Sequence, residues 1–159
     1  MKLEEKVVDL LHKKNLVMAC AESCTGGLIA KRITDVSGSS AVFNCGVVSY
    51  SNEIKENVLG VKKETLREFG AVSEQTVREM VDGVLKMSGA DIAVSVSGIA
   101  GPNSDNTSKP VGLIFIAISD GRETVIKRLN NNFTSDVRNS NRTSASDEAL
   151  KMIIKMIGD

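Results

Sequence analysis

The stretch Ala21-Glu22-Ser23-Cys24-Thr25-Gly26-Gly27 decides the fold, because the pattern of the sequence changes on either side of it. Before it, residues 16–20 form a short, continuous apolar run, which is typical of a strand buried on both faces. After it, residues 28–33 carry apolar side chains at helical spacing, and Thr25 is expected to cap the first turn. The pattern predicts a strand, a tight turn of small residues and a helix that meet at Ser23.

A turn of this kind has two interpretations. It can raise a side chain out of the sheet edge and present free backbone N–H groups to a ligand. The paired glycines, Gly26 and Gly27, would let that ligand approach the backbone closely. The alternative is an ordinary strand-to-helix loop that contains serine and glycine without a functional role. The other loops of the chain have to distinguish the two.

The composition limits the classes of partner. We expect residues 1–159 to form a single domain, since this length is sufficient for a core of its own. Lysine plus arginine equals aspartate plus glutamate, at 20 each, so the chain lacks the basic charge of a nucleic-acid binder. With four Phe, one Tyr and no Trp, it also lacks a stacking platform for single strands. We therefore expect no nucleic-acid partner.

The sequence also lacks the signals of a membrane or secreted protein. No apolar run approaches the roughly 18 residues of a membrane span, and the N-terminus has no apolar signal-peptide core. Three cysteines form no disulfide framework, which fits a reducing cytoplasm. Cys20 and Cys24 flank the central turn, but His12 is the only histidine, too few ligands for zinc. We expect a cytoplasmic protein with no membrane partner and no metal.

Apolar periodicity and turn residues predict the remaining elements. Helices are expected over 3–14, from 28 to about 34, from 51 onward, over 64–69, over 73–88 and from about 140 to 157. Strands are expected over 41–50, 91–96, 111–119 and 123–129, with Asp120-Gly121 as a hairpin turn. Early alternation of strands and helices favours a parallel sheet, to which the hairpin adds an antiparallel strand. The predicted fold class is α/β, a three-layer α/β/α sandwich with a mixed, mainly parallel sheet.

Three polar segments follow predicted strands. They are Ser23, residues 50–55 and Ser97-Gly98. Ligands of parallel α/β sheets bind outside the carboxyl ends of the strands. We therefore expect these segments to converge on one site.

Several catalytic arrangements do not fit these residues. A Ser-His-Asp triad would need His12, which the helical pattern places on a polar helix end away from the loops. No glycine loop is followed by the Gly-Lys-Ser/Thr of a phosphate-binding P-loop. The Ser-x-x-Lys helix motif of penicillin-binding proteins is also absent. What remains is a serine whose base comes from another segment.

Lys55 is the best candidate for that base. It lies in or just after the first turn of a short predicted helix, where the helix dipole and burial both favour the neutral amine. Tyr50 is placed to relay or position the proton. Backbone N–H groups of Thr25, Gly26 or Gly98 can stabilise an oxyanion.

Two alternatives stay open at this point. Cys24, beside Ser23, is a second candidate nucleophile, while a thiol that only packs is the other interpretation of a cysteine there. Lys55 is also of a residue type that commonly lies exposed at such helix positions. An exposed lysine would be charged at neutral pH and could not act as a base.

Five ordered motifs are similar to one known family. They are Ala21–Gly27, Tyr50-Ser51-Asn52-Glu53-Ile54-Lys55, Gly70-Ala71-Val72-Ser73, Ser97-Gly98-Ile99-Ala100-Gly101-Pro102 and Lys109-Pro110-Val111-Gly112. Together they resemble the C-terminal domain of the competence/damage-inducible protein A (CinA) family, over nearly the whole chain. Standalone members of that family are nicotinamide-mononucleotide amidases.

The resemblance implies an activity and a set of site residues. The expected reaction is hydrolysis of the carboxamide of nicotinamide mononucleotide, giving nicotinate mononucleotide and ammonia for pyridine-nucleotide salvage. Ser23, Tyr50 and Lys55 match the catalytic residues of the family, and neither a metal nor an organic cofactor is expected. A homodimer or larger homo-oligomer is implied. The expected substrate-binding positions are Glu22, Thr25, Gly26, Gly27, Ser39, Gly46, Ser97, Gly98, Ala100, Gly101 and Arg142.

The sequence departs from the family pattern in two segments. Asn103-Ser104 stands where the family has Asp-Gly. Phe133-Thr134-Ser135-Asp136-Val137-Arg138 stands where it has Phe-Ser-Gly-Asp-Arg, so the glycine is lost and the arginine displaced, while Arg142 matches a later arginine. A second hypothesis is therefore a nucleotide-binding or regulatory module with little turnover. Release of ammonia by the purified chain distinguishes the two.

Overall fold

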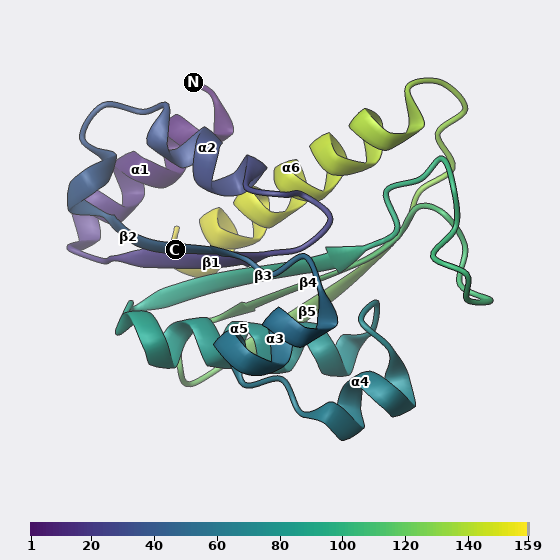
Figure 1. The fold of residues 1–159 in the computed structure, drawn as a ribbon. Coiled ribbons are helices and arrows are strands. Elements are labelled where there is room, and N and C mark those ends of the chain that lie inside the picture. Colours follow the sequence, from purple (N-terminus) through teal and green to yellow (C-terminus); the bar gives the residue numbers. More distant parts are fainter. Residues whose placement is uncertain (159) are drawn as a thin grey trace.

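The sheet contains five strands in the order β2-β1-β3-β4-β5 (Figure 1). The computed structural model describes residues 1–158, with strands β1 (Met18–Glu22), β2 (Phe43–Val48), β3 (Ile92–Gly98), β4 (Leu113–Ser119) and β5 (Thr124–Asn130). β1 pairs in parallel with both β2 and β3. β4 lies antiparallel between β3 and β5, so it alone runs against the other strands. The predicted mixed, mainly parallel sheet is confirmed.

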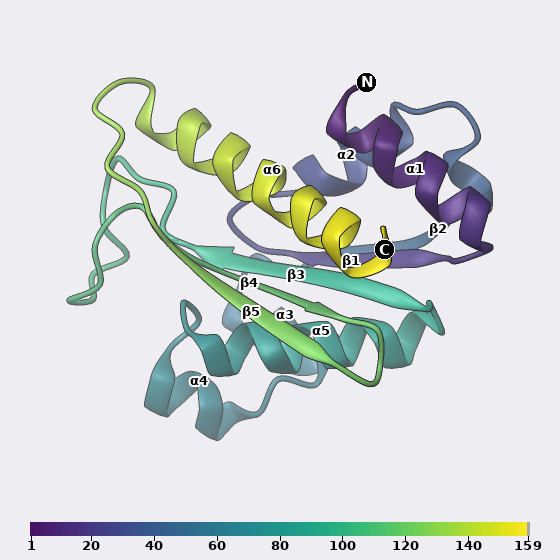
Figure 2. The ribbon, with the colours of Figure 1, turned by 180° about the vertical axis from the view of Figure 1, so that it is seen from behind.

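Helices cover both faces of this sheet. They are α1 (Leu3–Lys14), α2 (Leu28–Thr34), α3 (Asn52–Leu59), α4 (Lys63–Phe69), α5 (Glu74–Ser88) and α6 (Val137–Ile157), with a short 3₁₀ helix at Ser39–Ala41. α1, α2 and α6 lie on one face, whereas α3, α4 and α5 lie on the other (Figures 1 and 2). The structure is the three-layer α/β/α sandwich that the sequence predicts.

The burial of β1 follows from its place in the middle of the sandwich. All five of its residues are buried. Met18 and Cys20 belong to the core beneath α1, α2 and α6, whereas Ala19 and Ala21 belong to the core beneath α5. Successive side chains of a strand point to opposite faces, so a strand covered on both sides needs apolar residues at every position. This explains the apolar residues from Met18 to Ala21. The strand begins two residues later than the run at 16–20 predicts and ends on Glu22, whose buried carboxylate accepts hydrogen bonds from α2.

The start of α2 differs from the prediction. The N-cap of α2 is Gly27, and Thr25 makes no capping hydrogen bond, so the predicted cap is wrong. The buried carboxylate of Glu22 caps the helix instead, accepting hydrogen bonds from the N–H groups of Ile29 and Ala30 at 2.9 and 3.1 Å. A negative charge at a helix N-terminus is favoured by the helix dipole. The turn is thereby closed by the residue that precedes Ser23.

The remaining boundaries shift by a few residues. α6 begins at Val137, earlier than the position near Ser140 that apolar periodicity indicated, because its first turns are polar. β3 extends two residues beyond Val96, to Gly98, and β2 is shorter than predicted.

Within residues 1–158, no helix combines the length and the apolar character that crossing a membrane requires.

The carboxyl ends of β1, β2 and β3 lie at one edge of the sheet because these strands run in parallel. At the same end, the loop after β3 and the segment that leads into α6 lie side by side (Figures 1 and 2). The N–H of Gly112 donates to Ile99, and the N–H of Asn131 donates to Gly112, which connects these segments. The loops singled out from the sequence therefore meet in space.

Candidate active site

Ser23 follows β1 directly and is held to the neighbouring strands. Its N–H donates to the carbonyl of Val96 in β3 at 3.0 Å. The carbonyl of Glu22 accepts from the N–H of Ser49, just after β2, at 2.8 Å. The chain then turns through Gly26 and Gly27, whose φ angles of +59° and +100° favour glycine. These bonds fix Ser23 at the carboxyl edge of the sheet.

Lys55 reaches Ser23 from α3. Ser51 caps this helix by accepting a hydrogen bond from the N–H of Ile54 at 3.2 Å. The Nζ atom of Lys55 lies 2.9 Å from Oγ of Ser23 and 2.7 Å from the carbonyl oxygen of Ser49. Lys55 is only 1% exposed. The predicted buried contact between Lys55 and Ser23 is confirmed.

Burial lowers the pKa of Lys55 from 10.5 to about 8, because removal from water disfavours the charged ammonium. A pKa of 8 leaves roughly a tenth of the amine neutral at pH 7. In the neutral form an N–H can donate to the carbonyl of Ser49 while the nitrogen lone pair accepts the hydrogen bond of the Ser23 hydroxyl. This arrangement is suited to removing the proton of Ser23.

Cys24 has the opposite character. Its side chain is buried, and burial raises the pKa of the thiol to about 12, with the charge of Glu22 acting in the same direction. The thiolate is the nucleophilic form of cysteine, and it is scarce at neutral pH when the pKa is so high. The local environment therefore favours Ser23 over Cys24 as the nucleophile.

A pocket opens over this pair of residues. Its wall consists of Ser23, Cys24, Tyr50, Asn52, Lys55, Ala71, Val72, Ser97, Gly98, Ile99, Ala100, Gly101, Asn103, Ser104, Asp105 and Arg138. Of the expected binding positions, Ser97, Gly98, Ala100 and Gly101 belong to it. The hydroxyl of Ser97 donates to the carbonyl of Ala71 at 2.7 Å, so it joins two sides of the pocket.

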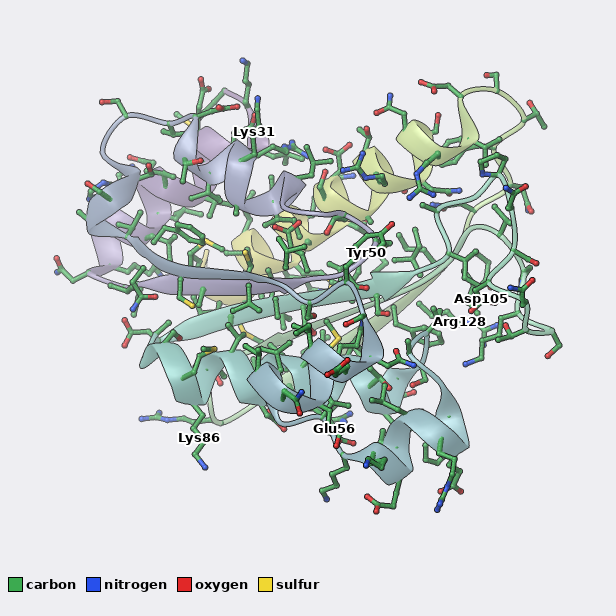
Figure 3. All side chains as sticks on the ribbon, in the orientation of Figure 1. Lys31, Tyr50, Glu56, Lys86, Asp105 and Arg128 are labelled. Carbon is green, nitrogen blue, oxygen red and sulfur yellow. The ribbon has the colours of Figure 1, made fainter. Side chains whose placement is uncertain are left out.

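Tyr50 lies at the exposed side of this pocket, just beyond β2 and near the centre of the view in Figure 3. It is 60% exposed, and its hydroxyl accepts a hydrogen bond from Nη2 of Arg138 at 2.9 Å. Within residues 1–158, no hydrogen bond joins it to Ser23 or Lys55. A role for Tyr50 in proton relay stays a prediction, whereas its place at the pocket is clear.

Seven of the expected binding positions lie outside the pocket wall: Glu22, Thr25, Gly26, Gly27, Ser39, Gly46 and Arg142. A substrate-binding role for these seven positions stays a prediction, and the contacts that the structure gives them are with the rest of the chain. Glu22 caps α2. Ser39 is buried in the 3₁₀ helix. Gly46 lies in the middle of β2, where an added Cβ would meet the ring of Phe43 at 3.1 Å.

The four remaining positions outside the pocket belong to the turn or support it. Thr25, Gly26 and Gly27 form the turn after Cys24. Arg142 donates to carbonyl oxygens of this turn, from Nε to Cys24 at 3.1 Å and from Nη2 to Thr25 at 2.9 Å. Arg142 therefore contacts the back of the turn and does not line the pocket.

The predicted oxyanion donors are not equivalent. The N–H of Gly26 donates to the carbonyl of Ser23 at 3.0 Å and is therefore engaged within the turn. Gly98 pairs with Ile114 in β4, next to the pair in which Ile99 donates to Leu113. Because antiparallel ladders alternate, the N–H of Gly98 points away from β4, toward the side on which Ser23 lies. Gly98 and Thr25 remain as candidate donors.

Arg138 is the main site residue absent from the expected set. It extends from the first turn of α6, donating to the carbonyl of Gly101 at 2.7 Å and to the hydroxyl of Tyr50. It is the displaced arginine of the segment 133–138, which was the signal that could have identified it. Asn103 and Ser104, the other departure from the family pattern, also line the pocket.

The remaining motif residue, Lys109, supports the pocket from outside. Its Nζ atom donates to the carbonyls of Phe69 and Val72, at the turn between α4 and α5. Two motifs that are far apart in the sequence are thereby joined.

Across the described chain, no three His, Cys, Asp or Glu side chains come together as a metal-binding group.

The fold and the site define an α/β protein with a buried serine–lysine pair at the carboxyl ends of parallel strands. Comparison with known proteins gives the family. The model of the CinA C-terminal domain matches residues 1–157, and the chain belongs to this family.

Relatives and solved structures agree. A CinA-like protein of Thermotoga neapolitana is 47% identical over 154 residues, which is 97% of this chain and 37% of the relative. A competence damage-inducible protein A of Klebsiella pneumoniae superposes with a TM-score of 0.93 at 36% identity, covering 98% of this chain and 95% of that one. A competence/damage inducible protein of Agrobacterium tumefaciens gives a TM-score of 0.91 at 39% identity, covering 97% and 93%. The chain spans only about 36–37% of the length of the curated relatives first matched.

Proposed function

We propose that the chain is an amidohydrolase that converts nicotinamide mononucleotide to nicotinate mononucleotide and ammonia, and that residues 1–159 act as one amidase domain. The observation that carries this proposal is the buried contact between Lys55 and Ser23, with a lysine pKa of about 8. A buried amine beside a hydroxyl adds nothing evident to the packing of the core. The pair is instead the arrangement expected of a serine nucleophile and a lysine base.

In the first half of the reaction, Ser23 Oγ attacks the carboxamide carbon while its proton moves to Nζ of Lys55. The oxygen of the tetrahedral intermediate would be stabilised by the N–H groups of Gly98 and Thr25. Lys55 then returns the proton to the amide nitrogen. The C–N bond breaks, ammonia leaves, and an ester of Ser23 remains.

In the second half, a water molecule attacks this ester. Lys55, neutral again, takes a proton from the water and afterwards returns it to Oγ of Ser23 as the C–O bond breaks. The products are nicotinate mononucleotide and the original enzyme. The carbonyl of Ser49 binds an N–H of Lys55 throughout, which keeps the amine oriented toward Ser23.

Arg138 is suited to holding the anionic part of the substrate. Lys55, Asp105 and Arg138 are the charged side chains of the pocket wall, and Arg138 lies at its exposed side beside Tyr50. A guanidinium binds a phosphate through two parallel hydrogen bonds. A mononucleotide could therefore place its phosphate at Arg138 and its carboxamide at Ser23.

The experiment is an assay of ammonia release by the purified chain with a panel of carboxamides. The panel contains nicotinamide mononucleotide, nicotinamide riboside and free nicotinamide. Turnover of the mononucleotide supports the amidase. Binding of the mononucleotide without ammonia release would favour the second hypothesis, a nucleotide-binding module, which the altered segment 133–138 motivates. The homo-oligomeric state stays a prediction that light scattering can measure.

A further inference from the structure

The beginning of α6 holds two walls of the pocket through their backbone carbonyls. Nδ2 of Asn141, which is buried, donates to the carbonyl of Ala100 at 2.9 Å. The next residue, Arg142, donates to the carbonyls of Cys24 and Thr25 at 3.1 and 2.9 Å. Neither Asn141 nor Arg142 lines the pocket. Both act on the peptide units that surround Ser23.

The contact of Arg142 has a specific consequence for the peptide between Cys24 and Thr25. In a trans peptide the carbonyl and the N–H point in opposite directions. Holding the carbonyl of Cys24 toward α6 therefore directs the N–H of Thr25 away from α6. A cationic donor on the carbonyl also polarises the peptide, which strengthens its N–H as a hydrogen-bond donor.

The turn has few other constraints of its own. Its internal hydrogen bonds run from Gly26 to Ser23 and from Leu28 to Thr25. The hydroxyl of Thr25 is buried and makes no hydrogen bond among the described residues. The orientation of the Cys24–Thr25 peptide thus depends on Arg142.

We propose that Arg142 is a positioning residue, which orients and polarises the Cys24–Thr25 peptide beside the nucleophile, and not a substrate ligand. This proposal rests on the proposed amidase function. It predicts that Arg142 acts on the transition state through the turn, because an oxyanion develops only as Ser23 attacks.

The test compares Arg142→Gln and Arg142→Lys with wild type in the ammonia assay. Both variants should lose about 10- to 100-fold in kcat, the effect of a displaced catalytic group, with KM within about twofold. Lysine is expected to fail because a single ammonium cannot reproduce the fork that binds two carbonyls. The midpoint of the pH profile should not move, since burial is the main cause of the Lys55 pKa shift and Arg142 does not contribute to it. A raised KM with an unchanged kcat would overturn the proposal.

Two variants serve as comparisons. Arg67→Gln removes an exposed arginine of α4 far from the turn and should behave as wild type. Arg138→Gln removes the guanidinium of the pocket wall and should raise KM more than it lowers kcat. The opposite signatures of Arg138→Gln and Arg142→Gln would separate a binding residue from a positioning residue.

A second readout does not depend on the substrate. Amide hydrogen exchange over residues 24–28 should become at least about tenfold faster in Arg142→Gln than in wild type, while exchange in α5 is unchanged. If wild type releases no ammonia, the proposed function fails and this exchange experiment still decides the role of Arg142. Unchanged exchange in the turn would overturn the positioning role. If the melting temperature shows that Arg142→Gln folds poorly, the exchange and ammonia measurements are made on Arg142→Lys, which keeps the charge and most of the side-chain stem.

Discussion

The Nζ atom of Lys55 lies 2.9 Å from Oγ of Ser23, although the two residues belong to different elements, the turn after β1 and the first turn of α3. Ser49 connects them: its N–H donates to the carbonyl of Glu22, next to Ser23, and its own carbonyl accepts a hydrogen bond from Lys55. The position of Lys55 relative to Ser23 is thus fixed through the ends of two parallel strands. Its burial sets the protonation state on which the proposed chemistry depends.

The first prediction concerns pH. If neutral Lys55 is the base, kcat/KM for ammonia release should rise with pH through an apparent pKa near 8, the value to which burial lowers this group. Activity is low below that pKa because the amine is protonated there. Initial rates at low substrate concentration between pH 6 and 10 provide the measurement. A rate that is flat across this range, or that falls as pH rises through 8, would exclude Lys55 as the base.

The second prediction links Lys55 to stability. Its pKa is lower in the folded chain than in the unfolded chain, so between about pH 8 and 10.5 the unfolded state binds more protons. The penalty for burying the charged amine is fully present below pH 8 and disappears as pH rises to 10.5. Relative to Lys55→Met, wild type should therefore gain roughly 3 kcal/mol of unfolding free energy over this interval.

Urea denaturation of wild type and Lys55→Met at several pH values measures the unfolding free energy of each. Subtracting one value from the other cancels the effect of pH on all groups other than Lys55. A difference in unfolding free energy that stays constant with pH would contradict the prediction.

Both Lys55→Met and Lys55→Arg should be nearly inactive. Methionine has no amine, and arginine keeps the positive charge but does not deprotonate. The urea curves also show whether each variant is folded, so that a loss of activity can be assigned to the missing base and not to unfolding.

The third prediction separates the two nucleophile candidates. Cys24→Ala should keep most of the wild-type rate, because the Cys24 thiol is buried and its pKa is raised to about 12. A loss of stability of about 1 kcal/mol or more is expected from the cavity that the smaller side chain leaves. Steady-state ammonia release under reducing conditions checks the rate. An inactive but folded Cys24→Ala would shift the nucleophile to the thiol.

The fourth prediction concerns the phosphate of the substrate. Nicotinamide mononucleotide should be turned over far more efficiently than free nicotinamide, because Arg138 offers a cation at the exposed side of the pocket. The difference should shrink strongly in Arg138→Gln. Competition by inorganic phosphate gives an independent check. Equal kcat/KM values for the two substrates in wild type would argue against a nucleotide pocket.

Much of this architecture could be predicted from the sequence because it depends on local patterns. The apolar run before Ser23 and the period of α5 each reflect a single element and its burial. The meeting of Ser23 and Lys55 followed from a general rule, since parallel strands bring their carboxyl ends to one edge. The order of strands and helices therefore predicts which loops lie together at the carboxyl edge of the sheet.

The contacts of Glu22, Arg138 and Arg142 were not predictable in the same way. Arg142 binds carbonyls 117 and 118 positions earlier in the chain, and no periodicity reports such a contact. The polar start of α6 lacks an apolar stripe, which is why both its first residue and its role were missed. Glu22 is predicted as a binding residue beside Ser23, and its role as the cap of α2 depends on the return of the chain into that helix, which no local pattern reports.

The central claim is that Ser23 attacks the carboxamide, and the most direct measurement is ammonia release from nicotinamide mononucleotide by wild type and Ser23→Ala side by side. Ser23 lies on a turn and its hydroxyl hydrogen-bonds only with Lys55 among the described residues, so the variant should fold and still bind the mononucleotide. We predict steady ammonia release by wild type and a loss of at least about 1,000-fold in kcat for Ser23→Ala, as expected when a nucleophile is removed. Ammonia release by folded Ser23→Ala at the wild-type rate would contradict the account.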